Sequence, residues 1–236
     1  MKVRGRRECK ACRTTWSYYE TDDISCPECG SLHSVGIDDE RTLHTATAVT
    51  LDLTSVRAMV DAEPLRRLAQ RAGDTVLPFT RGYGFIHTGQ LQPLDDTYLA
   101  AMELRYVAGE LGRRLNVSDD EGWYFTKLLQ ADEGHRPGPE DVPQSMRSAR
   151  GLAYANAVRE YRSDLQTYLD EYPDAAVNSP SERLSNHVRR IRALDGDVAP
   201  RTANSMVSAA RALGRYVIED DEAALALAEE HLNALE

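Results

Sequence analysis

The stretch that decides the fold of the N-terminal region is residues 9–30, which read CKACRTTWSYYETDDISCPECG. It holds all four cysteines of the chain as two Cys-x-x-Cys pairs, and a spacer of 13 residues separates the pairs. Two residues between cysteines let the backbone turn tightly enough for both sulfurs to face one ion. The spacing therefore predicts tetrahedral coordination of one metal ion by Cys9, Cys12, Cys26 and Cys29.

Four thiolates fill a tetrahedral site and leave no position for water, so we expect one structural Zn²⁺ rather than a catalytic one. An iron site of the rubredoxin kind and redox-active thiols are the alternatives for the same cysteines. In the second knuckle, the turn around the second pair, Pro27 presets the turn and Gly30 can adopt a positive φ. In the first knuckle Arg13 follows the second cysteine of the pair, so we expect a less regular turn there.

The spacer predicts a small β module between the two knuckles. Its strand-favouring residues are Thr14, Thr15, Trp16, Tyr18 and Tyr19. A module of this size cannot bury enough surface to fold alone. Zinc binding supplies the missing free energy, typically about 10–16 kcal/mol in small zinc peptides. His33 and His44 are interpreted as ordinary surface histidines rather than replacement ligands.

From residue 94 onward, apolar residues recur at helical spacing. One face of a long helix carries Leu94, Tyr98, Ala101, Leu104, Ala108, Leu111 and Leu115. Short connections between successive helical stretches predict antiparallel packing as a bundle. We therefore expect a mainly α fold, with a small N-terminal β zinc ribbon over residues 1–40. A mixed strand and short-helix segment over residues 41–90 and a helical bundle over residues 91–236 complete the predicted organisation.

The mixed segment gives three local predictions. Residues 49–53 alternate apolar and polar side chains, which predicts a short strand. Two short helices are expected at residues 55–61 and 63–72, and the second is expected to end at Gly73. The segment is therefore expected to connect the ribbon to the bundle through short elements.

Three signals in the bundle predict helix starts and a packing seam. Ser118 and Glu121 form an S-x-x-E capping box, and Ser179-Pro180-Ser181-Glu182 predicts a helix start with Ser179 as the N-cap. A long helix is expected over residues 144–172. Its seam is Tyr154, Val158, Tyr161, Leu165, Tyr168 and Tyr172. We interpret this seam as bundle core, and a coiled-coil-like seam for a second copy or a partner is the alternative.

The composition is that of an acidic, soluble protein. The 236 residues carry a formal net charge of −10, and no apolar run approaches the ~18–20 residues of a membrane span. The basic N-terminus leads straight into Cys9 without an apolar segment, so we expect no secretory signal and a cytoplasmic location. The only lysines are Lys2, Lys10 and Lys127. Such a composition is typical of proteins from extreme halophiles, and a GC-rich genome is the alternative explanation.

Residues 1–40 resemble the zinc ribbon of the archaeal and eukaryotic transcription factor B type. The resemblance rests on Glu8-Cys9-Lys10-Ala11-Cys12, Trp16-Ser17-Tyr18-Tyr19-Glu20 and Cys26-Pro27-Glu28-Cys29-Gly30-Ser31-Leu32-His33. The whole chain resembles an uncharacterised haloarchaeal family of zinc-ribbon proteins. Nothing after residue 40 resembles the cyclin-like repeats of the transcription factor, so its role in recruiting polymerase is not carried over.

Zinc ribbons commonly bind nucleic acid or another protein. The residues expected to contact a partner are Arg4, Arg6, Arg7, Lys10, Trp16, Tyr18 and Tyr19. A protein partner is favoured, because electrostatic binding to nucleic acid weakens steeply with salt. The predicted function is therefore a non-catalytic binding or regulatory protein, and the resemblance suggests an association with transcription. The first alternative is a nucleic-acid-binding module that uses the basic N-terminal arm and the ribbon. No membrane partner is expected, and the helical region is the candidate surface for a homo-oligomer.

An enzyme with its site in the helical region is the second alternative. The chain has no Walker motif, no G-x-S-x-G, no H-E-x-x-H and no cysteine outside the ribbon. Asp132, Glu133 and His135 lie close together in the sequence, and we interpret them as a solvated cluster at a helix end. The sequence therefore favours binding over catalysis.

Overall fold

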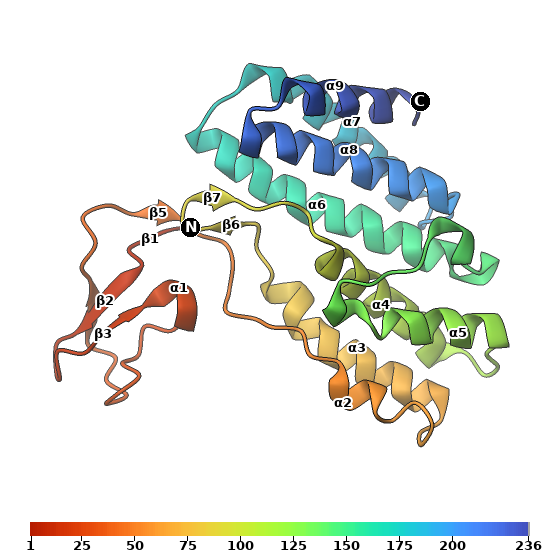
Figure 1. The fold of residues 1–236 in the computed structure, drawn as a ribbon, viewed down its shortest axis with the longest axis horizontal. Helices are drawn as coiled ribbons and strands as arrows, with labels where there is room; N and C mark the ends of the chain where they lie inside the picture. The colour runs from red at the N-terminus through yellow and green to blue at the C-terminus, as the bar shows by residue number, and fades with distance from the viewer. Residues whose placement is uncertain (236) are drawn as a thin grey trace.

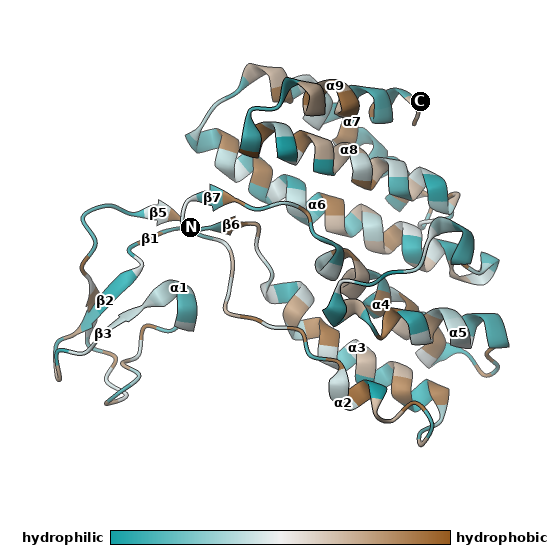
Figure 2. Ribbon diagram, in the orientation of Figure 1, coloured by the Kyte–Doolittle hydropathy of each residue, from teal (hydrophilic) through white to brown (hydrophobic). Residues whose placement is uncertain are grey.

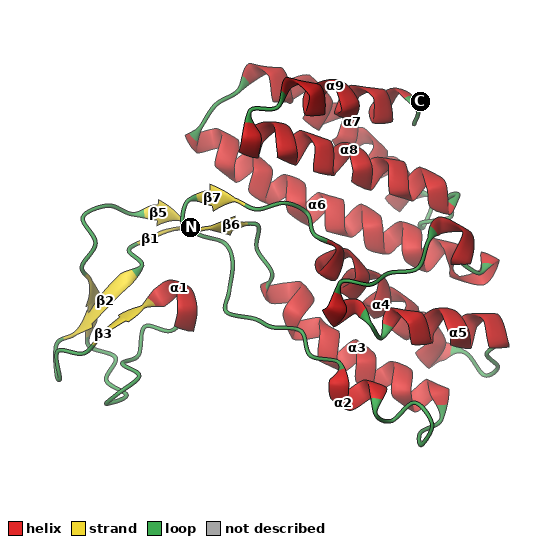
Figure 3. Ribbon diagram, viewed as in Figure 1, coloured by secondary structure: helices red, strands yellow, loops and turns green. Residues whose placement is uncertain are grey.

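The computed structural model describes residues 1–235 and is mainly α-helical, with a small β part near the N-terminus (Figure 1 and Figure 3), which confirms the predicted fold class. The strands are β1 (Lys2–Val3), β2 (Arg6–Cys9), β3 (Thr15–Ser17), β4 (Ser34–Gly36), β5 (Thr42–Leu43), β6 (Ile86–His87) and β7 (Gln90–Leu91). The helices are α1 (Tyr18–Thr21), α2 (Thr54–Arg57), α3 (Leu65–Gly82), α4 (Asp96–Arg113), α5 (Asp119–Leu128), α6 (Arg147–Glu171), α7 (Asn178–Ala193), α8 (Pro200–Glu219) and α9 (Glu222–Asn233).

The ribbon, residues 1–40, is built on a three-stranded antiparallel sheet in the order β3-β2-β4. Arg7 pairs with Trp16 of β3 and with Gly36 of β4, so β2 is the central strand. The Arg7 guanidinium donates to the hydroxyl of Ser34 at 2.9 Å and thus ties β2 to β4. The expected hairpin strand in the spacer is shorter than predicted, because the chain turns into α1 directly after Ser17.

The helices from α3 to α9 form one stack, which we call the helical body. α3 packs against α4, α4 against α6, α6 against α7 and α8, and α8 against α9. Figure 1 shows these helices side by side. Their apolar faces share one continuous core that extends from Leu43 to Leu235. In Figure 2, hydrophobic and hydrophilic residues alternate along these helices, as expected for helices buried on one face.

The helix-start signals of the body are correct in one case and misplaced in the other. The capping box of α5 is confirmed, since the Ser118 hydroxyl accepts from the Glu121 N–H and the Glu121 carboxylate accepts from the Ser118 N–H. Ser179 is not the N-cap of α7, which begins one residue earlier. A 3₁₀ turn over residues 175–177 runs directly into α7, and Asp174 caps this turn by accepting from the Ala176 N–H at 2.9 Å.

The mixed segment differs from its prediction in three places, of which the first is the helix expected at residues 55–61: α2 ends at Arg57 after one turn. Residues 49–53 form no strand but an irregular chain, whose Leu53 is buried and donates its N–H to Asp132 Oδ2 at 2.7 Å. The alternating pattern thus reflects burial against the helical body rather than pairing with another strand. The helix expected to end at Gly73 continues to Gly82. Gly73 lies inside α3 where the helix faces α4, and a Cβ there would make an ordinary contact of 3.6 Å with the Cβ of Ala108, so the residue neither ends nor strains the helix.

The tyrosine seam of α6 divides into a buried part and an exposed end. Tyr154 and Tyr161 are fully buried, which confirms that this part belongs to the core of the body. Tyr168 is half-buried and stacks against the exposed Tyr172, with ring centroids 4.8 Å apart. The seam therefore contributes most of its apolar surface to the fold of a single chain.

A buried polar network crosses the core of the body. Arg150 and Glu103 are both fully buried, with NH1 and Oε1 2.8 Å apart. The hydroxyls of Tyr124 and Tyr154 donate to the two oxygens of Glu103, and Arg150 also donates to the amide oxygen of Asn204 at 3.0 Å. Because these partners satisfy most of the buried charge, the network is a structural link between α4, α5, α6 and α8.

A junction of extended segments joins the ribbon to the body. β1 pairs with β5, and the chain after β5 runs beside the β6–β7 hairpin, where the Thr45 N–H donates to the Ile86 carbonyl at 2.9 Å. Asp164 of α6 holds this region by accepting from the Thr45 hydroxyl at 2.7 Å and from the Phe85 N–H at 2.6 Å. Lys2 Nζ lies 2.7 Å from a carboxylate oxygen of Glu171. The ribbon is thus anchored to α6.

None of the helices in the described part of the chain, residues 1–235, is long and apolar enough to cross a membrane.

Candidate metal centre

The first knuckle is the turn between β2 and β3. The N–H of Cys9 donates to the carbonyl of Thr14 at 2.9 Å, and the N–H of Arg13 donates to the carbonyl of Cys9 at 3.0 Å. Arg13 has a φ of 67°, in the left-handed region that residues other than glycine rarely adopt. The turn requires a positive φ at this position although the residue there has a side chain.

The second knuckle repeats the geometry of the first. The N–H of Cys26 donates to the carbonyl of Ser31 at 2.9 Å, and the N–H of Gly30 donates to the carbonyl of Cys26 at 2.8 Å. Gly30 has a φ of 68°, nearly the value of Arg13. The first knuckle is therefore as regular as the second, unlike the expectation from the sequence.

The two knuckles bring the four cysteine sulfurs together within 4.8 Å of one another. The sulfurs of Cys9 and Cys29 are 3.7 Å apart, and those of Cys12 and Cys26 are 3.5 Å apart. A tetrahedron with Zn–S bonds of about 2.3 Å has sulfur–sulfur edges of about 3.8 Å. A disulfide would require about 2.05 Å. The four residues can therefore hold one metal ion, and their spacing fits the zinc–thiolate tetrahedron.

Hydrogen bonds give the thiols of this site different acidities. The hydroxyl oxygen of Thr14 lies 3.3 Å from Cys12 Sγ, and hydrogen bonds with Thr14 lower the pKa of the Cys12 thiol to about 6. A backbone hydrogen bond from Ser31 favours the Cys29 thiolate. Hydrogen bonds with the other three sulfurs and burial outweigh it and raise the pKa of Cys29 to about 12. A metal ion at this site must therefore displace protons when it binds.

Trp16 lies inside the ribbon. Its side chain is buried with Cys9 and Cys26 in the ribbon's own small core, and its indole N–H donates to the carbonyl of Asp23 at 3.1 Å. The sequence suggested Trp16 as an exposed partner contact, but its burial leaves little surface for a partner. Trp16 therefore fills the core of a module that, over residues 1–40, buries only two other side chains, those of Cys9 and Cys26, both of which are candidate metal ligands.

Tyr18 and Tyr19 point to the junction with the body. The ring of Tyr19 covers Gly5, where an added Cβ would lie 1.8 Å from the ring, and its hydroxyl is hydrogen-bonded to Thr42 at 2.5 Å. The ring centroid of Tyr19 is 4.7 Å from that of His44, and Tyr18 makes an edge contact with the same histidine at 6.3 Å. His44 is buried rather than on the surface, because these tyrosines cover it.

The basic residues expected to contact a partner are spread along the first strands: Arg4, Arg6, Arg7 and Lys10. Several of them already have partners within the ribbon. Arg6 Nε lies 3.8 Å from Asp38, and the Glu8 carboxylate lies 3.3 Å from Lys10 and 2.9 Å from Arg13. The positive charge of the N-terminal segment is therefore partly balanced by carboxylates on the same module.

Three exposed apolar residues on the ribbon escaped the sequence analysis. Ile24 is 48% exposed, Leu32 is 69% exposed and Val35 is 39% exposed. Ile24 lies beside β4, because the Ser34 hydroxyl donates to its carbonyl at 2.6 Å. We call these three residues the exposed apolar residues of the ribbon. The signal in the sequence was the presence of large apolar residues next to a knuckle in a module too small to bury them.

The Asp132, Glu133 and His135 cluster has a structural role for its first member. The Asp132 carboxylate is mostly buried, pairs with the Arg57 guanidinium and accepts from the Leu53 N–H. His135 Nδ1 lies 3.5 Å from the Glu133 carboxylate, and both of these side chains are exposed. The cluster thus holds α2 against the turn after α5, and the interpretation as a solvated cluster is wrong for Asp132, which is buried against Arg57 and Leu53.

The family model that describes a family of unknown function, DUF7117, matches residues 1–232, and the chain belongs to this family. Neither the curated proteins nor the solved structures contain a significant match to this chain. The match covers the ribbon, the junction and almost all of the helical body, so these parts occur together in the family.

Proposed function

We propose that this member of the DUF7117 family is a non-catalytic protein whose ribbon holds one structural zinc ion and docks a protein partner. The observation that carries the proposal is the exposure of three apolar residues, Ile24, Leu32 and Val35, in the module that holds the four-cysteine site. Zinc would fix the two knuckles and thereby the positions of these residues. The resemblance to transcription factor B ribbons makes transcription the process in which to look for the partner.

The chemistry of the site supports zinc and a reducing compartment. Four thiolates and no open position suit a structural zinc ion, and free thiols at disulfide-incompatible distances suit the cytoplasm. The acidic, lysine-poor composition further suggests that the protein works in concentrated salt, where apolar contacts remain strong while surface charge pairs are screened.

The first alternative, a nucleic-acid-binding ribbon, has weaker support. Binding to phosphates needs cations that are free to replace counterions. Here Arg6, Lys10 and Arg13 have carboxylate partners on the same module, and the whole chain carries a net charge of −10. A Lys10→Ala variant whose loss of charge weakens DNA or RNA binding in anisotropy measurements at native salt would favour this alternative over a protein partner.

The docking proposal is tested by purification of the tagged full-length protein from its native host in molar KCl. Partners identified by mass spectrometry are compared between the wild-type protein and an Ile24→Asp/Leu32→Asp variant, because both residues lie outside the strands. Leu115→Asp, at a fully exposed position of the body, is the matched control. We expect a partner that the control retains and the ribbon variant loses, with zinc content unchanged in both. Identical partner sets for all three proteins would refute the proposal.

A further inference from the structure

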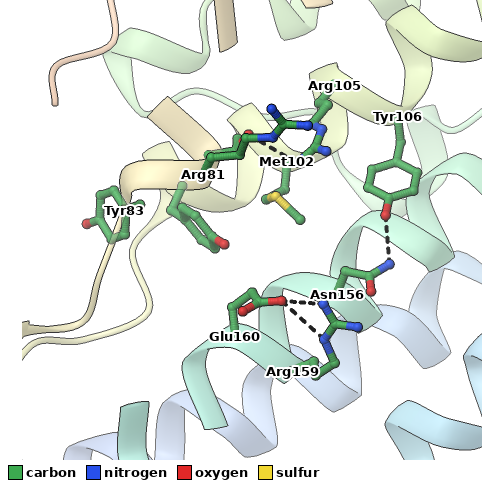
Figure 4. Close-up of a pocket in the computed structure, with 10 residues that line it drawn as sticks. Arg81, Tyr83, Met102, Arg105, Tyr106, Asn156, Arg159 and Glu160 are labelled. Atoms are coloured by element: carbon green, nitrogen blue, oxygen red, sulfur yellow. Dashed lines mark hydrogen bonds and ion pairs between the residues drawn. The ribbon is translucent and has the colours of Figure 1, made fainter. Parts of the chain in front are cut away.

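A pocket of about 280 Å³ lies in the helical body, away from the ribbon (Figure 4). Its walls come from the C-terminal end of α3, the segment after it, the middle of α4 and the middle of α6. The residues that line it and enter the argument are Arg81, Tyr98, Arg105, Tyr106, Arg159 and Glu160. This volume is close to the lower end of the ~300–1,000 Å³ typical of small-molecule sites.

The pocket concentrates positive charge in an acidic protein. Arg81, Arg105 and Arg159 oppose a single carboxylate, Glu160, so the lining has a net charge of +2 while the chain has −10. In Figure 4, Arg81 and Arg105 project from one side of the pocket, and Arg159 and Glu160 lie on the facing helix. Like charges gathered at one opening repel one another, and a bound anion would remove this repulsion.

The guanidinium groups have unused donors. Arg105 donates to the Thr80 hydroxyl at 3.3 Å, and Arg159 donates to Glu160 with Nε and Oε1 3.1 Å apart. Within residues 1–235, the Arg81 side chain has no hydrogen bond or ion pair. A guanidinium group offers five N–H donors in a planar fork that matches carboxylate and phosphate oxygens. Most of the donors at this pocket are thus available to a ligand.

Tyr98 supplies an independent sign of a missing partner. Its side chain is fully buried and lines the pocket, and its hydroxyl has no hydrogen-bond partner among the described residues. The ring is held by Tyr83 and Phe85, with centroids 4.7 Å and 5.0 Å away. An unpartnered buried hydroxyl lowers the stability of the folded protein, a loss that phenylalanine at this position would avoid.

The surroundings of the Tyr98 hydroxyl keep it protonated. Burial raises the pKa of Tyr98 well above its usual value, so the group stays a donor at neutral pH. The charges that act on it belong to Glu160, Arg105, Asp164 and Arg159, three of which line the pocket. Because Tyr98 lines the pocket and its hydroxyl has no partner among the described residues, this donor is free for a ligand oxygen.

We propose that this pocket binds a small organic oxyanion, a ligand that carries a phosphate or carboxylate group. The arginines hold the anionic group, and the Tyr98 hydroxyl donates to one of its oxygens. The Tyr106 hydroxyl, which accepts from the Asn156 amide at 2.8 Å, keeps its own proton for a second donation. The site shares no residue with the ribbon, so the proposal of anion binding can be tested independently of the docking proposal.

The first test is isothermal titration calorimetry of the full-length, zinc-loaded protein. The probes are inorganic phosphate, pyrophosphate and citrate at matched ionic strength, with sodium chloride and glycerol as blanks. We expect at least one anion to bind with a Kd of about 1 mM or below. Preference for the phosphates would assign a phosphate-bearing ligand, and preference for citrate a carboxylate-bearing one. The absence of binding by all three up to about 10 mM would overturn the proposal.

The second test separates the site from unspecific attraction. Arg81→Ala should weaken binding at least about tenfold, because a charge-assisted hydrogen bond contributes about 1.5–3 kcal/mol. Arg192→Ala, which removes an exposed arginine of α7, is the matched control and should leave the Kd unchanged. Equal weakening of binding by both variants would show that only the net charge of the protein matters, and it would refute specific anion binding in the pocket.

The third test uses the unpartnered hydroxyl. Tyr98→Phe should weaken anion binding about fivefold while the ligand-free protein keeps or raises its Tm, because the lost hydroxyl had no partner. Tyr161→Phe is the matched control, since the Tyr161 hydroxyl is also buried and unpartnered but does not line the pocket. It should leave the affinity unchanged. An unchanged affinity in Tyr98→Phe would contradict the proposed role of this hydroxyl in binding.

Discussion

The ribbon and the helical body are stabilised in opposite ways. The ribbon buries a core of Cys9, Trp16 and Cys26, and two of these three residues are candidate metal ligands. The body buries a continuous apolar core that spans α3 to α9 and encloses the ion pair of Glu103 and Arg150. The comparison teaches that the ribbon has too little apolar core to fold by packing alone, so we expect it to depend on a bound metal ion while the body depends on packing. Perturbations aimed at either source of stability should therefore separate the two regions.

The largest separation is expected on removal of the metal. Chelation, or Cys26→Ser, should unfold the ribbon, because metal binding contributes about 10–16 kcal/mol in small zinc modules. The body should stay folded, because its core contains none of the ligands. In a Trp123→Phe background the remaining tryptophan is the buried Trp16, so its emission should shift to the red while the far-UV dichroism of the helices persists. Loss of the helical signal together with the tryptophan shift would show that the regions do not separate.

Metal analysis completes this test. The purified wild-type protein should contain about one zinc ion per chain, and Cys26→Ser should contain less. Ser25→Ala, a change beside the same ligand that keeps all four thiols, serves as the control. Iron in place of zinc would keep the geometry of the site but change the assignment of the metal.

The reverse separation is expected from the buried ion pair. Arg150→Met leaves Glu103 without its cationic partner in the core, which should lower the free energy of unfolding of the body by about 3–5 kcal/mol. The metal content of the ribbon should not change. Urea unfolding followed by far-UV dichroism measures the effect, and Arg192→Ala on the surface of α7 is the control. A loss below about 1 kcal/mol would mean that tyrosine donors alone stabilise Glu103.

The smallest effect concerns the two knuckles, whose backbones are nearly the same although one has Arg13 and the other Gly30 at positive φ. Gly30→Ala should weaken zinc affinity about five- to thirtyfold, because a Cβ in this region costs about 1–2 kcal/mol. Arg13→Gly should relieve the same strain and tighten binding relative to Arg13→Ala. This alanine variant is the control because both changes remove the ion pair with Glu8.

Competition with a chromogenic chelator measures these affinities. If Arg13→Gly and Arg13→Ala bind zinc equally, the positive φ at the first knuckle carries no measurable cost. The shared geometry of the knuckles would then depend on the metal rather than on the backbone.

Local patterns predicted much of the fold correctly. The mainly α class followed from apolar spacing, and the capping box of Ser118 and Glu121 lies where it was expected. Signals that depend on the rest of the molecule were misread. Residues 49–53 alternate because one side of the chain meets the helical body, and Gly73 lies inside α3, which continues to Gly82. A periodicity states that a side chain is buried, but it does not state which element covers it.

The candidate metal site was the part most accessible from the sequence. Each knuckle is a turn of a few residues, and its hydrogen bonds join neighbours in the chain, so the Cys-x-x-Cys spacing already implies the geometry. The sites for ligands and partners were not accessible in this way. The pocket lined by Arg81, Arg105 and Arg159 is formed by residues of three different helices. Trp16 and Leu32 are both large apolar residues of the ribbon, and only the folded structure shows that the first is buried and the second exposed.

The sequence by itself determined the four candidate ligands, the helical character of the body and the acidic charge of the whole chain, because these depend on composition and on short spacings. Only the tertiary structure decided that His44 and Trp16 are buried, that three apolar residues of the ribbon are exposed, and that three arginines and an unpartnered tyrosine line one pocket. The physical reason is that burial and convergence arise from contacts between segments far apart in the chain, which short spacings do not encode.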